Sequence, residues 1–141
     1  MAVLFSSEMN GLLNTTPVSL PSGGIVDGNV RVKRATITLA AQTTSDTIVI
    51  AKAYEGESFL YGVINASATL GGSATIAIGI TGTVGKYRAA AGHTAVSVPT
   101  LFGVNAGVAT VAAEEEIFIT VAGASLPGAG NLIIDMYFSA T

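Results

Sequence analysis

The chain has 141 residues, of which 50% are hydrophobic and 11% are charged, and its formal net charge is −3. This length fits one domain whose core needs no disulfide or metal. The chain contains no cysteine, which excludes disulfides, thiolate nucleophiles and zinc–thiolate sites. The acidic balance gives no reason to expect a nucleic-acid partner. No apolar run reaches the roughly 20 residues that span a bilayer, so no membrane partner is expected.

Residues 1–29 predict an extended N-terminal arm with a short strand near residues 3–5. Turn residues recur there too often for a long helix or a central strand. They are Asn10, Gly11, Pro17, Pro21, Gly23, Gly24 and Gly28. In an assembly, such an arm can lie along a neighbour as an added strand. The segment lacks the basic region and the long apolar core of a signal peptide, so we expect synthesis in the cytoplasm without export.

The next two segments alternate as strands do. Residues 30–41 place Ile37 and Leu39 on one face, whereas Val30 and Val32 have the opposite parity. That slip predicts a β-bulge, or a strand that begins near Ala35. After a polar turn, residues 46–53 predict a second strand with an alternating apolar pattern.

Residues 57–82 predict two strands joined by a two-residue hairpin turn at Gly71-Gly72, because glycine supplies the positive φ that such turns require. In the first strand, Phe59, Tyr61 and Val63 point one way, and the intervening residues are also largely apolar. A strand that is apolar on both faces belongs inside a sheet or between two layers.

The remaining chain predicts further short strands, and residues 81–92 predict a loop with at most one helical turn. The strand segments are 96–98, 100–104, 108–111, 116–122 and 131–140. The last of these has a core face of Leu132, Ile134, Met136 and Phe138. Seven to nine short strands without a long helix predict an all-β protein, with one antiparallel β-sandwich domain over residues 30–141.

None of the usual reaction centres is present. The glycine-rich segment 79–86 departs from a phosphate-binding loop, because Ile80 stands at the first glycine position and Tyr87 at the hydroxyl position. His93 is the only histidine, and no serine elbow accompanies it, so it is interpreted as a surface loop residue. We therefore predict that the protein is not an enzyme. No catalytic, cofactor-binding or metal-binding residue is assigned.

The charged residues also have structural interpretations. Residues 114–116 are three consecutive glutamates, whereas calcium ligands are spaced along a loop, so a solvated turn is expected. A contact with basic residues of a partner is the alternative. Asp135 either faces outward or is buried against Arg or Lys. Arg31, Lys33 and Arg34 form the only basic cluster, which is either a solvated edge or a surface for an acidic partner.

Several segments together resemble a known group of proteins. These segments are DTIVI at 46–50, GVINAS at 62–67, SATIAIGI at 73–80, KYRAAA at 86–91 and EEIFITV at 115–121. Over residues 46–141 the chain is similar to small all-β virion proteins of tailed bacteriophages, of the head decoration or cement type. The resemblance implies a sandwich, often jelly-roll-like, on the outer capsid surface. It also implies the major capsid protein as partner and self-association as a trimer. No cofactor is expected.

The low charge content leaves two interpretations of the surface. Either Ser, Thr, Ala and Gly make it neutral but wettable, or neighbouring subunits cover much of it. We favour the second, because weakly charged exposed strands promote association. The expected function is therefore to cement a capsid by bridging neighbouring capsid subunits. The alternative is a tail or fibre component that contacts the host surface. The low aromatic content of 6% and the absence of tryptophan disfavour this alternative.

Overall fold

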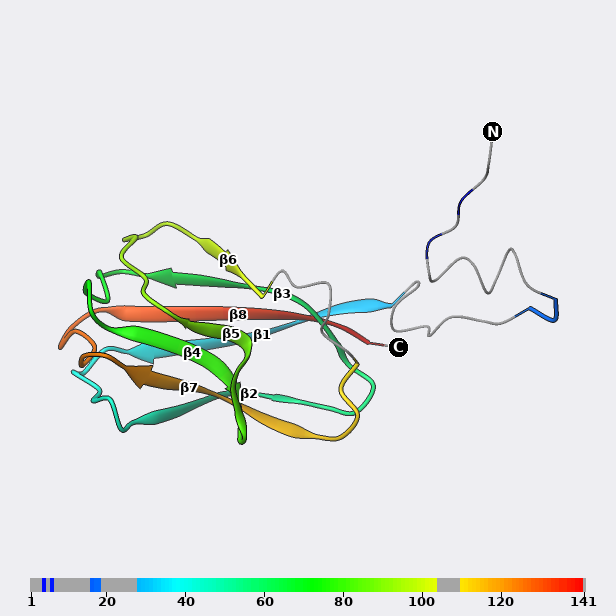
Figure 1. The fold of residues 1–141 in the computed structure, drawn as a ribbon. Helices are drawn as coiled ribbons and strands as arrows, with labels where there is room; N and C mark the ends of the chain where they lie inside the picture. Colours follow the sequence, from blue (N-terminus) through cyan, green and yellow to red (C-terminus); the bar gives the residue numbers. More distant parts are fainter. Residues whose placement is uncertain (1–3, 5, 7–15, 19–27, 104–109, 141) are drawn as a thin grey trace.

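The computed structural model describes residues 4, 6, 16–18, 28–103 and 110–140. These residues contain eight strands and no helix (Figure 1). The strands are β1 (Asn29–Thr38), β2 (Thr47–Ala53), β3 (Ser58–Ala66), β4 (Thr75–Ile80), β5 (Thr83–Ala91), β6 (Thr100–Phe102), β7 (Glu115–Ala122) and β8 (Asn131–Ala140). Within this part of the chain, no helix is long and apolar enough to cross a membrane.

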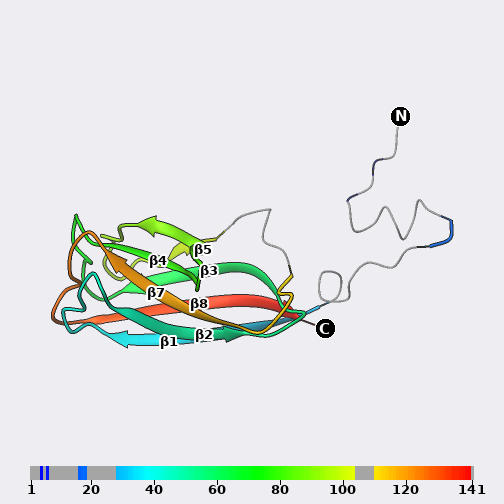
Figure 2. The same ribbon diagram turned by 60° about the horizontal axis from the view of Figure 1, so that its bottom comes forward.

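The strands form two antiparallel sheets with the orders β1-β8-β3-β6 and β2-β7-β4-β5. The two sheets lie face to face as the layers of a sandwich (Figures 1 and 2). Every connection between consecutive strands passes from one sheet to the other, except the hairpin between β4 and β5. Gly82, in the turn of that hairpin, has a φ of +83°. The predicted all-β sandwich is confirmed.

Alternating side chains from both sheets fill the space between the layers, as period two requires. All four residues of the predicted core face in β8 are buried, and so are Ile117, Ile119 and Val121 of β7. Four rings gather at one place in this core. The ring of Phe59 lies 4.8 Å from that of Tyr87 and 5.4 Å from that of Phe138, and it stacks on Phe102.

The predicted hairpin at Gly71-Gly72 is wrong. Gly71 does have a positive φ of 92°, but β3 and β4 belong to different sheets. The segment between them crosses the sandwich, and its Leu70 is buried, with its amide bonded to the carbonyl of His93. Regular alternation fixes which residues of a strand face inward, but it does not say which strand lies next to it.

The predicted bulge in residues 31–34 is also wrong. Strand β1 pairs with β8 in one unbroken register from Asn29 to Thr38. The bulge of this sheet lies in β3, between Phe59 and Tyr61. Phe59 therefore points into the core, whereas Tyr61 and Val63 lie on the outer side with intermediate exposure. Val30 and Val32 are apolar residues on the outer side of β1. Their parity is therefore opposite to that of the buried Ile37, and this difference led to the wrong prediction of a bulge.

Other segments differ from the expectations as well. Residues 86–91, expected in a loop, belong to β5, and residues 96–98 form no strand. The expected strand at 100–104 is present as β6 over three residues. Thr110 and Val111 lie outside any strand. Positions 104, 108 and 109 lie outside the described residues, and so does most of the expected arm, including positions 3 and 5.

Gly79 in β4 offers a test of the β4–β5 hairpin. A Cβ at this position would collide with the backbone of Thr83 and Val84, whereas a Cβ on Gly72 meets nothing within 4 Å. We expect Gly79→Ala to lower the free energy of unfolding by about 1–3 kcal/mol, because backbone atoms must move. Gly72→Ala should change it by less than about 0.5 kcal/mol. Urea unfolding of both variants measures this, and equal midpoints would contradict the hairpin geometry.

Candidate interaction surface

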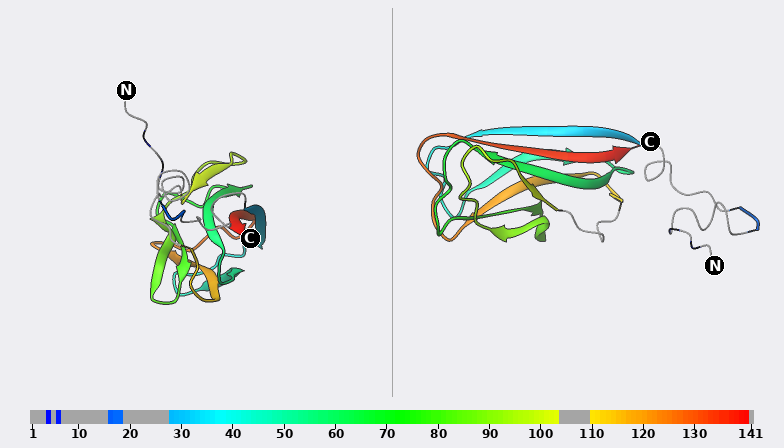
Figure 3. Two further views of the ribbon diagram at one scale, coloured as in Figure 1. Left: turned by 90° about the vertical axis from the view of Figure 1, so that its right-hand side faces the viewer. Right: turned by 90° about the horizontal axis from the view of Figure 1, so that it is seen from above.

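The outer side of the sheet β1-β8-β3-β6 carries a mostly apolar surface, which we name the tyrosine face. Figure 3 shows this sheet as one of the two layers of the sandwich. We define the tyrosine face by nine outward residues of its four strands, namely Val30, Val32, Arg34, Tyr61, Val63, Leu101, Ile133, Asp135 and Tyr137. The polar residues Thr36, Thr38 and Asn65 also point to this side and border the face. Strand pairing alone brings these residues together, because they come from four separate parts of the chain.

The centre of the tyrosine face is a row of three paired residues across three strands. Val32 of β1 is opposite Tyr137 of β8, and Tyr137 is opposite Tyr61 of β3. The two tyrosine rings stack with centroids 4.6 Å apart and an interplanar angle of 16°. Cross-strand aromatic pairs of this kind stabilise a sheet and present a rigid, partly apolar surface.

The only charges on the tyrosine face neutralise each other. Arg34 donates from Nε to Oδ1 of Asp135 and from its terminal nitrogen to Oδ2, both at 2.7 Å. This is the paired geometry that makes an Arg–carboxylate contact strong and directional. Asp135 thus faces outward and is also paired with an arginine. Of the two alternatives expected for it, outward-facing or buried against Arg or Lys, the structure shows features of both.

Part of the apolar surface around this ion pair is open to solvent, and the rest is half-buried. Val32 is 53% exposed and Leu101 is 61% exposed. Val63 lies between Leu101 and Asp135 in the same row. An aromatic and aliphatic centre without free charge is the usual composition of the core of a protein–protein interface. The tyrosine face is therefore suited to bind another polypeptide.

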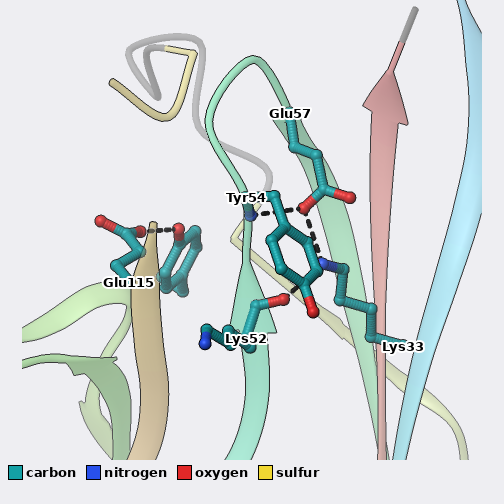
Figure 4. A network of polar contacts seen from close by, with 6 residues as sticks. Lys33, Lys52, Tyr54, Glu57 and Glu115 are labelled. Carbon is teal, nitrogen blue, oxygen red and sulfur yellow. Dashed lines mark hydrogen bonds and ion pairs between the residues drawn. The ribbon is translucent and has the colours of Figure 1, made fainter. Parts of the chain in front are cut away.

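A second set of charges lies on the inner side, at one end of the sandwich (Figure 4). Nζ of Lys33 is 2.6 Å from Oε2 of Glu57, and the same oxygen accepts a hydrogen bond from the amide of Tyr54 at 3.0 Å. Lys33 also donates to the carbonyl of Lys52, and it lies 4.9 Å from the ring centre of Phe138. The Glu57 side chain is only 4% exposed. These contacts join β1 to the turn between β2 and β3.

The glutamates at 114–116 are mostly bonded within the chain. Both carboxylate oxygens of Glu115 accept hydrogen bonds from Nζ of Lys86 at 2.7 Å, and Tyr87 donates to the same carboxylate. Burial, with this hydrogen bond, raises the pKa of the Tyr87 hydroxyl. Glu114 pairs with Lys52 at 2.6 Å on the surface. The expected solvated turn is wrong for Glu115, which begins β7 and is partly buried.

His93 is buried, with an exposed fraction of 5%, so its interpretation as a surface residue is wrong. Its Nε2 is enclosed and has no hydrogen-bond partner. Burial lowers the pKa of His93, and the positive charge of Arg88 lowers it further. Arg88 donates to three backbone carbonyls, those of Ile76, Ala91 and Gly92. The sequence did not predict this interaction of Arg88 with buried His93, because the segment that contains Arg88 was expected to be a loop.

The arrangement offers little chemistry. The segment 79–86 lies in the β4–β5 hairpin. Among the described residues, no three His, Asp or Glu side chains come close enough to hold a metal ion. Of the six basic side chains, five donate to carboxylates or carbonyls of the chain itself. Arg31 is the one without such a contact in the described part, and it is exposed.

The buried ion pair predicts a specific stability effect. Lys33→Met leaves the Glu57 carboxylate buried with only the Tyr54 amide as a direct donor. We expect this change to lower the free energy of unfolding by about 3 kcal/mol. The control Lys52→Met breaks an exposed ion pair and should cost less than about 1 kcal/mol. The double variant Lys33→Met/Glu57→Gln should recover part of the loss in urea unfolding. Equal effects of the two lysine changes would contradict a structural role for Lys33.

His93 predicts the pH dependence of stability. Its pKa in the folded protein is below the ordinary value of about 6.5, so the unfolded chain takes up the proton first as the pH falls. The stabilisation is therefore complete above that value and is lost as the pH falls below it, through the lowered pKa of the folded state. We expect His93→Gln to flatten this part of the profile in denaturant titrations. An unchanged slope in the variant would contradict the assignment.

No family model matches the sequence, and no curated protein matches it. Three solved phage capsid structures are similar to the chain in fold. A chain of the cyanophage Pam1 capsid asymmetric unit is 20% identical with a TM-score of 0.64, and the match covers 81% of this chain and 86% of that one. A chain of the capsid of Ralstonia phage GP4 is 17% identical with a TM-score of 0.63 and the same coverage.

The third similar structure is the acid-stable capsid of Helicobacter pylori bacteriophage KHP30. Its matching chain is 9% identical with a TM-score of 0.59, and the match covers 78% of this chain and 86% of that one. At such low identities the likeness establishes the fold and leaves the role to be argued from the surface. The chain has the fold of a phage virion protein, as the resemblance in its sequence implied.

Proposed function

We propose that the protein is a non-enzymatic virion component that decorates and cements a bacteriophage capsid by bridging neighbouring major capsid subunits. The observation that carries this proposal is the fold likeness, because the same sandwich spans 86% of the matching chain in each of three phage capsids. A fold that accounts for most of those chains leaves little room in them for a separate catalytic domain.

The charge distribution supports a role in binding other proteins. Five of the six basic side chains are used inside the chain, so the described surface has little free positive charge for nucleic acid. Apart from Arg34, which is paired with Asp135, the exposed residues of the tyrosine face are apolar. Contacts of this kind are weak one at a time, but a trimer that contacts several capsid subunits at once gains affinity through multivalency. We therefore propose a homotrimer on the outer surface of the capsid.

The strand order supports a jelly roll as the specific type of sandwich. Eight strands in two sheets of four, with nearly every connection crossing between the sheets, fit the double Greek key of that topology. In this interpretation residues 30–141 are one domain, and residues 1–29 form an arm beside it. We infer that the sandwich is a rigid body for binding, whereas the arm is available for neighbouring subunits.

The test uses phage shells that lack the protein. We expect the purified chain to have three times its 14.1 kDa mass in solution, and to sediment with those shells after mixing. Shells that already carry the protein are the control, and they should take up none. The decorated shells should withstand heat better than bare ones.

A monomer that ignores the shells would contradict cementing. If the same preparation bound host cells or a glycan array, the role would be that of a tail or fibre component. The tyrosine face favours cementing over sugar binding, because its two central aromatic side chains stack on each other rather than stand free for a sugar.

A further inference from the structure

We propose that the tyrosine face binds the N-terminal segment, residues 1–27, of a second copy of this chain. This inference deepens the proposed self-association and does not depend on capsid binding. It starts from the exposed side chains of the face. An apolar surface of valine, leucine and tyrosine, with its one ion pair satisfied internally, gains free energy when another apolar segment covers it.

The N-terminal segment has the composition that suits this face. Twelve of residues 1–27 are apolar, and only Glu8 and Asp27 are charged. Two apolar residues of the segment are described, and both are open to solvent, Leu4 at 88% and Val18 at 57%. The sandwich of the same chain therefore leaves these side chains uncovered. A second copy offers them a surface that is likewise uncovered.

The segment is long enough to reach another copy. Fully extended, 27 residues span up to about 90 Å, whereas the ten-residue strands of the sandwich span about 33 Å. Asn29, at the start of β1, pairs with Ala140, so the segment leaves the sandwich at the end where the chain also finishes. The chain is thus attached at one end of the sheet and can extend past it to a neighbour.

Charge does not oppose this contact. The tyrosine face presents no unpaired acid that would repel Glu8 or Asp27 of the incoming segment. An exchange of such segments around a ring of copies would close the assembly, because each copy gives one segment and receives one.

The absence of cysteine in the chain permits a direct test with introduced cysteines. One full-length population carries Val18→Cys and a second, isotopically labelled population carries Leu101→Cys. The two are co-refolded at equal amounts and treated with a short bismaleimide. We expect a cross-linked species that contains one chain of each kind, identified by its mass. Leu4→Cys in place of Val18→Cys provides a second position on the segment.

The matched control replaces Leu101→Cys with Val84→Cys, at an exposed position of β5 in the other sheet. Mixed cross-links should be at least tenfold rarer with this variant. Equal yields at positions 84 and 101, from both segment positions, would overturn the proposal. Cross-links only between two Leu101→Cys chains would show that two faces meet directly, which would also overturn it.

A double variant separates exchange from folding back. If Val18→Cys/Leu101→Cys forms its cross-link within one chain and the mixed populations form none, the segment covers its own sandwich and the proposal is wrong. The result is independent of capsid binding, which the sedimentation experiment measures separately. A mixed cross-link in a protein that ignores shells would keep this inference and reject cementing.

Discussion

The pairing of β8 with both β1 and β3 is the constraint on which the rest of the structure depends. β8 lies between these two strands, and its register with β1 runs unbroken over ten residues. Its inward residues Leu132, Ile134, Met136 and Phe138 form much of the core, while its outward residues Asp135 and Tyr137 form the centre of the tyrosine face. β8, the last strand of the chain, thus pairs with the first. Because side chains alternate along it, it also contributes both to the core and to the tyrosine face.

The sequence predicts those parts of the fold that depend on local alternation. The core face of β8 and the buried set Ile117, Ile119 and Val121 in β7 follow directly from period two. Strand partners do not follow, because pairing joins residues far apart in the chain. Residues 67–74 have turn glycines that suit a hairpin, yet they connect two sheets. The β5 segment has residues with helical propensity, and pairing with β4 overrides that preference.

The candidate surface is harder to predict, and the reason is again distance along the chain. Arg34 and Asp135 are 101 residues apart, and only the register of β1 on β8 brings them together. Tyr61 and Tyr137 meet because a bulge in β3 turns Tyr61 outward. No local feature of the sequence around Phe59 predicts that bulge. Burial of His93 has the same origin, since the carbonyl of this residue accepts the amide of Leu70 from a separate crossing segment.

The scarcity of charge has a consequence for both proposals. With six basic and nine acidic residues, the chain has few charges for solubility, and it places Lys33, Arg34 and Lys86 in contacts of its own. Such pairs fix strand ends and registers, but they leave the exposed strands without the free lysines that discourage association. A surface of this kind gains free energy when it is covered. The proposed assembly with other copies and with a shell would account for the composition, the internal ion pairs and the exposed tyrosine face together.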